Sequence, residues 1–147
     1  MSKPYALELE LYRNWYNASH YFLDNVIKSV ESHGLKVDQF RVLEFLYSHE
    51  GPHTIQKISE QLHIPSGSIT YVINNLAKKD YVQKKPCPTD GRVTHVSLTA
   101  TGEEMIREIV PEHIEFISSK IGKISEEEMK LLLELLGKLK QCFRKDS

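Results

Sequence analysis

The sequence is poor in the patterns that mark several common classes of protein. Its two cysteines, Cys87 and Cys142, are too few for a disulfide framework. The seven histidines form no cluster with metal-ligand spacing, so we expect no metal and no other cofactor. A phosphate-binding glycine loop and the Gly-x-Ser-x-Gly turn of a catalytic serine are both missing. Since no nucleophile stands in a pattern with a base either, these absences argue against an enzyme.

Long apolar runs are missing as well. No stretch approaches the roughly 18 residues that a membrane-spanning helix needs, and the polar first residues lack the pattern of a secretory signal. We therefore expect a cytoplasmic protein with no membrane contact. The chain has 147 residues, of which 40% are hydrophobic and 27% are charged. These values are typical of soluble globular proteins, and the length predicts a single domain over residues 1–147.

Net charge is small, but it is unevenly distributed. The formal net charge of the whole chain is −1. Between Thr54 and Thr99, however, six basic residues outnumber three acidic ones. A basic segment within an acidic frame favours an anion-binding surface, such as a surface for nucleic acid.

The first part of the chain predicts two helices. Apolar residues recur every three or four positions over residues 4–33, which indicates a long helix that Gly34 is placed to end. Asp38 is predicted to cap a second helix, which stops before Gly51 and Pro52.

Two shorter helices follow, and together they form a helix-turn-helix pattern. Thr54 is predicted to cap the third helix and Ser66 the fourth, with a tight connection between them. The fourth helix carries one apolar stripe, made of Ile69, Val72, Ile73 and Leu76. We expect the stripe to be buried and the opposite, polar face to be exposed.

A β-hairpin is predicted after the fourth helix. Residues 81–85 and 93–98 read as strands, and the connection between them is rich in turn residues. A helix-turn-helix followed by a hairpin is a winged helix. The predicted fold class is therefore mainly α with a small β-hairpin wing, in which residues 38–99 form the winged-helix lobe.

The terminal segments, residues 1–37 and 100–147, predict helices that lie outside this lobe. Pro111 is expected to kink or interrupt a helix over 100–121, and Ser125 with Glu128 forms a capping box that opens a leucine-rich last helix. A single chain would leave much of this apolar surface exposed to water, so we interpret these segments as dimerisation helices. The alternative is that they pack on their own chain.

The combination of these elements resembles the MarR-type winged-helix regulators over essentially the whole chain. The stretches that carry the resemblance are Ile-Ser-Glu-Gln-Leu at 58–62, Ser-Gly-Ser-Ile-Thr-Tyr-Val-Ile-Asn-Asn-Leu at 66–76, Lys-Lys-Asp-Tyr-Val at 78–82, the wing motif Asp90-x-Arg92, and Val-Ser-Leu-Thr-x-x-Gly at 96–102. Within the family, the segments 67–72 and 86–90 are most similar to the branch that responds to quinones and related electrophiles. One departure is Gly67, where the family often has a polar or basic residue.

The resemblance implies a homodimeric transcriptional repressor that binds a pseudo-palindromic operator in double-stranded DNA. A small phenolic or quinone-type inducer, or thiol modification, would release it. The residues predicted to contact DNA are Ser66, Ser68, Thr70, Tyr71, Asn74, Asn75, Lys78, Lys84, Lys85, Asp90 and Arg92. Asn can pair with adenine through two hydrogen bonds, and Arg92 is expected in a narrow minor groove, braced by Asp90. The alternative is a winged-helix module for protein–protein contact that binds no specific DNA.

Two routes for the signal remain open. Cys87 lies in the wing turn near Lys84, Lys85 and Arg92, and positive neighbours lower the pKa of a thiol, so Cys87 is a candidate redox sensor. Alternatively, it is a small turn residue without chemistry. By resemblance to ligand-binding family members, a pocket between the dimerisation helices and the winged-helix lobe would be lined by Trp15, Tyr16, His20, Phe40 and Phe45. Such aromatic residues are more often core residues.

Overall fold

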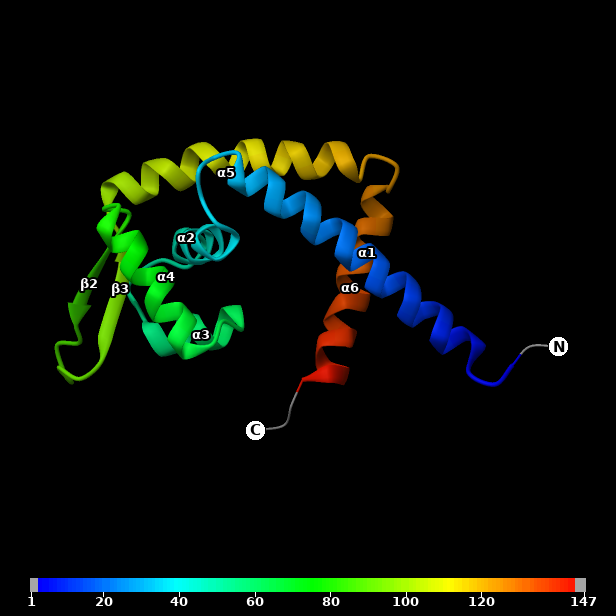
Figure 1. Cartoon of the computed structure of the whole chain (residues 1–147), viewed down its shortest axis with the longest axis horizontal. Coiled ribbons are helices and arrows are strands. Elements are labelled where there is room, and N and C mark those ends of the chain that lie inside the picture. The colour runs from blue at the N-terminus through cyan, green and yellow to red at the C-terminus, as the bar shows by residue number, and fades with distance from the viewer. Residues whose placement is uncertain (1–2, 145–147) are drawn as a thin grey trace. The chain divides into compact units, whose positions relative to one another are not determined.

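The computed structural model describes residues 3–144, which form two compact units. One unit extends up to His113 and the other begins at Ile114, so the division falls inside a helix. The elements in chain order are α1 (Ala6–Glu31), α2 (Val37–Ser48), β1 (His53–Thr54), α3 (Ile55–Leu62), α4 (Ser66–Lys78), β2 (Val82–Pro86), β3 (Thr94–Leu98), α5 (Ala100–Lys120) and α6 (Glu126–Phe143). Figure 1 shows the hairpin of β2 and β3 extending from the end of α4. The predicted fold class, mainly helical with a β-hairpin wing, is confirmed.

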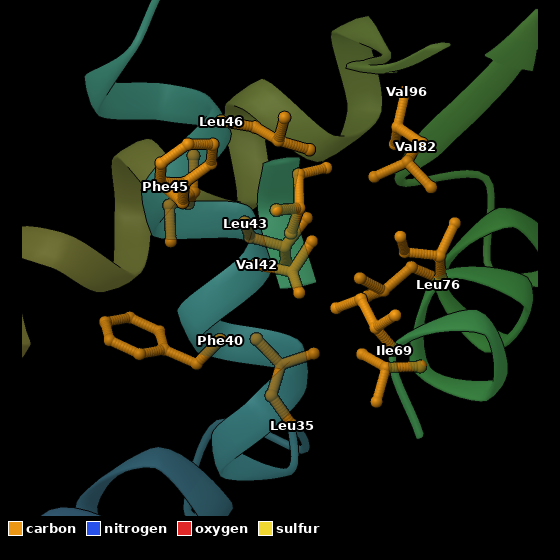
Figure 2. Close-up of a cluster of buried hydrophobic side chains, with 14 of the residues drawn as sticks. Leu35, Phe40, Val42, Leu43, Phe45, Leu46, Ile69, Leu76, Val82 and Val96 are labelled. Carbon is orange, nitrogen blue, oxygen red and sulfur yellow. The ribbon is translucent and has the colours of Figure 1, made fainter. Parts of the chain in front are cut away.

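The core of the first unit lies between α2, α4 and the hairpin. Figure 2 shows Leu43 of α2, Ile69 and Leu76 of α4, and Val82 and Val96 of the strands directed toward one another. The whole predicted stripe of α4 is buried, because its i, i+3, i+4, i+7 spacing places all four side chains on the face that meets α2. Burying that face leaves the polar side of α4 exposed.

The sheet has three antiparallel strands in the order β1, β3, β2. In the hairpin, Lys84 stands opposite Val96 and Val82 opposite Leu98. The sequence did not predict β1, because a strand of two residues is too short to show alternation. β1 is an edge strand of the sheet, and α3 follows it directly in the chain.

The helix caps predicted at Asp38 and Ser66 are wrong, whereas those predicted at Thr54 and Ser125 are confirmed. Asp38 lies within the first turn of α2, since the helix begins at Val37 after Lys36. Ser66 is the first residue of α4 and follows Pro65 at the cap position. In contrast, the Thr54 hydroxyl accepts a hydrogen bond from the Lys57 N–H at 3.0 Å.

The capping box of α6 forms as predicted. The Ser125 hydroxyl accepts from the Glu128 N–H at 3.1 Å, and the Glu128 carboxylate accepts from the Ser125 N–H at 3.0 Å. These reciprocal bonds lower the pKa of the Glu128 carboxyl group. No side chain of α6 is buried within the single chain.

The sequence predicted that Pro111 would kink or interrupt a helix, and the structure shows that it does not interrupt α5. The helix runs unbroken from Ala100 to Lys120, although proline cannot donate the hydrogen bond of its turn. Ile106 and Ile109 are buried just before Pro111, and His113 makes contacts just after it. Packing on both sides of Pro111 therefore stabilises the continuous helix.

The start of α5 approaches the backbone of Tyr81, between α4 and β2, very closely. Thr99 accepts a hydrogen bond from the Gly102 N–H at 3.0 Å, and its own N–H donates to the Tyr81 carbonyl at 3.1 Å. A side chain on Gly102 would collide with the Tyr81 carbonyl group, whose carbon would be 2.8 Å from the added Cβ. Only glycine fits this contact, which fixes the wing relative to α5.

A half-buried histidine joins α5 to α1 and α2. The His113 ring lies 3.3 Å from the Ser29 hydroxyl, and its centroid is 4.9 Å from that of Phe40. The ring of His33, which follows α1, lies 3.4 Å from the carboxylate of Glu112 on α5. Desolvation, and secondarily the charge of His33, lower the pKa of His113 below its ordinary value.

The lowered pKa of His113 predicts a loss of stability in mild acid. Because the folded state binds this proton less readily than the unfolded chain does, the stabilisation is fully present above the unfolded pKa of about 6.5. It is lost as the pH falls from there through the lower pKa of the folded state. We expect the free energy of unfolding to decrease as the pH falls below about 6.5, and the decrease to be smaller in His113→Gln. Urea titrations at a series of pH values measure it. Identical pH dependence in both proteins would contradict the prediction.

Within residues 3–144, no helix is long and apolar enough to span a membrane.

Candidate nucleic-acid interface

The exposed face of α4 carries the polar residues that the sequence predicts for DNA contact. Ser68, Thr70 and Tyr71 are exposed, and Tyr71 is 70% exposed despite its large ring. Asn74 and Asn75 are half-buried further along the same helix. The two ends of the set, Ser66 and Lys78, are also exposed. Because the apolar stripe is anchored in the core, this row of side chains is held on a rigid helix.

Two side chains of this row already make hydrogen bonds within the chain. The Thr70 hydroxyl donates to the Ser66 carbonyl one turn earlier, at 3.0 Å. The Asn74 side-chain carbonyl accepts from the Lys84 ammonium of β2 at 2.5 Å. This second bond connects the helix to the wing, and sequence reasoning missed it. Only the packing of β2 against α4 places the two residues side by side.

The turn of the wing holds Asp90 and Arg92 together. The Arg92 guanidinium donates to both carboxylate oxygens of Asp90, at 3.1 and 3.4 Å, and the Arg92 backbone N–H donates to one of them at 3.1 Å. These bonds lower the pKa of the Asp90 carboxyl group. The Arg92 side chain is nevertheless 90% exposed. Asp90 therefore braces the turn and orients an arginine that remains open to solvent.

Lys84 and Lys85 are exposed on β2, beside the same turn. Together with Lys78 and Arg92 they place four positive charges on α4 and the wing. An exposed polar helix face beside basic wing residues has the composition of a surface that binds a polyanion.

Cys87 lies at the base of the wing turn and is half-buried. Its Sγ is 3.2 Å from the Thr89 hydroxyl, and its backbone N–H donates to the Val93 carbonyl at 2.8 Å. Hydrogen bonds from the side chain and backbone of Thr89, and then from the backbone of Asp90, lower the pKa of the thiol, while desolvation and the charge of Asp90 oppose them. The direction agrees with the sequence prediction, but the principal cause is the turn rather than the neighbouring cations.

This geometry predicts how Cys87 reacts with alkylating agents. Because the thiolate is the reactive form, the rate of alkylation should rise at a lower pH than it does for an ordinary thiol. Replacing Thr89 by valine removes the hydroxyl and should shift the profile to higher pH. The rate of iodoacetamide labelling against pH, measured in a Cys142→Ser background, tests this. If the pH profiles of labelling are the same with and without Thr89→Val, the hydrogen bond with Thr89 has no effect on the pKa of the Cys87 thiol.

The five residues predicted to line an inducer pocket occupy different surroundings. Phe40 and Phe45 are buried, and Phe45 stacks on His49 with the ring centroids 4.4 Å apart. Tyr16 is exposed and contacts Tyr12 of the same helix. The remaining two, Trp15 and His20, lie on α1 as well.

Two cavities of the first unit are lined by other residues. One has a volume of about 660 Å³ and lies between α1, the start of α2 and α4, where Ser68, Tyr71 and Asn75 face it. The other has a volume of about 550 Å³ and is lined by residues that include Tyr47, Ser97 and Arg107. The first cavity opens beside the residues predicted for DNA contact.

The fold and this surface define the class as a winged helix-turn-helix protein. A model of the MarR family matches residues 33–93. The HTH-type transcriptional regulator MhqR of Bacillus subtilis is 38% identical over 116 residues, which cover 79% of each chain. The chain belongs to the MarR family, and it is a DNA-binding transcriptional regulator.

Solved structures agree with this assignment. A MarR-like transcription regulator from Bacillus cereus superposes with a TM-score of 0.78 at 28% identity, covering 93% of this chain and 98% of its own. Sco3205, a MarR family regulator from Streptomyces coelicolor solved in complex with DNA, has a TM-score of 0.87 at 17% identity and covers 99% of this chain and 93% of its own. This second likeness concerns the fold alone.

Proposed function

We propose that the chain acts as a homodimeric repressor that binds a pseudo-palindromic operator. The observation that carries the proposal is the exposed polar face of α4 together with the exposed Arg92 of the wing. In the complex, α4 enters the major groove and Arg92 reaches the flanking minor groove. Ser68, Tyr71 and Asn74 contact base edges or phosphates, and the lysines neutralise phosphates.

The dimer is supported by apolar side chains that α1 and α6 each leave exposed. On α1, Leu7, Tyr12 and Phe22 are 75%, 62% and 55% exposed. On α6, the leucines from Leu131 to Leu133 and from Leu135 to Leu136 are between 40% and 69% exposed. Water contact with so much apolar surface is unfavourable, and a symmetric second copy buries it. A dimer also supplies two recognition helices for two half-sites.

Release from DNA follows from the need for both recognition helices to fit at once. Half-sites lie about 34 Å apart, one helical turn, so a modest change in the spacing of the two α4 helices prevents simultaneous binding. An inducer that favours such a dimer shifts the population away from DNA. The signal is a phenolic or quinone compound. It acts through a pocket that includes Trp15, Tyr16, His20, Phe40 and Phe45, or through modification of Cys87.

The test is binding of the purified protein to the DNA upstream of its own gene, titrated with benzoquinone. Wild type, Cys87→Ser and the matched control Cys142→Ser are compared by gel shift. Release of wild type and of Cys142→Ser, with retention of Cys87→Ser, assigns the switch to the wing thiol. Release of all three assigns it to the pocket. Failure to bind that DNA or any duplex selected from a random pool would overturn the proposed function.

A further inference from the structure

The contact between the recognition helix and the wing involves one specific pair of side chains. Lys84 of β2 donates from its ammonium group to the side-chain carbonyl of Asn74 on α4, at 2.5 Å. Asn74 is half-buried, while Lys84 is exposed and stands opposite the buried Val96 in the hairpin. The register of the hairpin thus places a cation directly against an amide in the row predicted to face DNA.

The chemistry of this bond fixes the orientation of the Asn74 amide. An ammonium group has only donors, so the amide must present its oxygen to Lys84. The NH₂ group is then directed away from Lys84. A free asparagine reads adenine by donating from NH₂ to N7 and accepting from the N6 amino group with its oxygen. Lys84 occupies one of the two lone pairs of the oxygen, so the pair offers the donors of both groups and only one free acceptor position.

Guanine is the base whose major-groove edge best matches a pair in which donors predominate. It presents two acceptors, N7 and O6, whereas adenine presents one acceptor and one donor. We propose that Asn74 and Lys84 form a specificity-determining unit that selects guanine in each half-site, with Lys84 as the positioning residue. The inference rests on the proposed function, because it requires that α4 binds in the major groove. It replaces the expectation that Asn74 pairs with adenine.

Lys85 provides a matched control on the same strand. It carries the same charge and is equally exposed, but it stands opposite His95 and successive strand residues point to opposite faces. Lys84→Met and Lys85→Met each remove one ammonium group and keep the aliphatic stem. A lysine that only neutralises phosphates weakens binding to all sequences alike, whereas a positioning lysine changes which base is preferred.

The experiment first selects duplexes from a random pool with the wild-type protein. Dissociation constants are then measured for duplexes that carry G·C or A·T at each position of one half-site. We expect wild type to prefer guanine at one position by about tenfold. Lys84→Met should reduce this preference to about threefold or less, or reverse it toward adenine. Lys85→Met should keep the wild-type preference and lose affinity uniformly.

A double-variant cycle tests whether the two residues act as a unit. Asn74→Ala should remove the guanine preference, and adding Lys84→Met to it should change the preference no further. The same base preference in wild type and Lys84→Met would overturn the inference while leaving the proposed function intact. An adenine preference in wild type would also overturn it. Failure of the wild type to enrich any duplex overturns the proposed function itself.

Discussion

Arg92→Glu is expected to lower the affinity for operator DNA about 100-fold or more. Arg92 is exposed at the wing, and Asp90 orients its guanidinium by two side-chain bonds. A charge-assisted hydrogen bond is worth about 1.5–3 kcal/mol, and the proposed dimer loses one such contact in each half. The new carboxylate would in addition be repelled by phosphates and by Asp90. Fluorescence anisotropy with labelled operator, over a range of salt concentrations, measures the loss.

Arg107→Glu is the matched control for this charge reversal. Arg107 lies on α5, where it pairs with Glu103, and its side chain is 62% exposed. We expect the control to retain affinity within about threefold, since it reverses the same charge on α5, outside the residues predicted to contact DNA. The salt dependence of binding should become shallower in Arg92→Glu only. Tight binding by Arg92→Glu at low salt would show that Arg92 of the wing lies outside the DNA interface.

Gly102→Ala is expected to destabilise the fold by about 3 kcal/mol, at the upper end of the range for overpacking. The added Cβ would meet the Tyr81 carbonyl group, with Tyr81 Cα 3.0 Å away. Backbone atoms cannot rotate aside as a flexible side chain can, so either α5 or the segment between α4 and β2 must shift. The shift would also break the hydrogen bonds that Thr99 makes with Tyr81 and Gly102.

Gly67→Ala is the control for the same added methyl group. An added Cβ at Gly67 meets no atom within 4 Å, and alanine has the higher helix propensity. We therefore expect no loss of stability in Gly67→Ala. Urea denaturation at a fixed protein concentration compares the two variants, because dimerisation would make the midpoint depend on concentration. Equal stability of Gly102→Ala and wild type would show that the contact with Tyr81 can relax.

Much of the fold was predictable because its elements carry strong local signals. The stripe of α4 has perfect helical spacing, and Ser125 with Glu128 has the spacing of a capping box, so both were confirmed. The caps at Asp38 and Ser66 failed because several neighbouring residues could begin each helix. The predicted interruption of the helix at Pro111 does not occur, because the packing of α5 outweighs one missing hydrogen bond.

The candidate site was predictable as a set of residue types and not as a set of contacts. The polar face of α4 and the Asp90–Arg92 motif follow from spacing along one helix and one turn. The bond from Lys84 to Asn74 joins residues of different elements, and no local pattern predicts it. The origin of the lowered pKa of Cys87 likewise depends on the conformation of the turn, which places the Thr89 hydroxyl at 3.2 Å.

The sequence alone determined the order and type of the main helices and the hairpin, the buried stripe and the polar face of α4. It did so because hydrophobic periodicity and turn chemistry act within a few residues. Only the tertiary structure decided that Gly102 must lack a side chain, that α5 continues through Pro111 and that Lys84 holds Asn74. Each of these features depends on packing between different elements, and its energy depends on a geometry that local spacing does not encode.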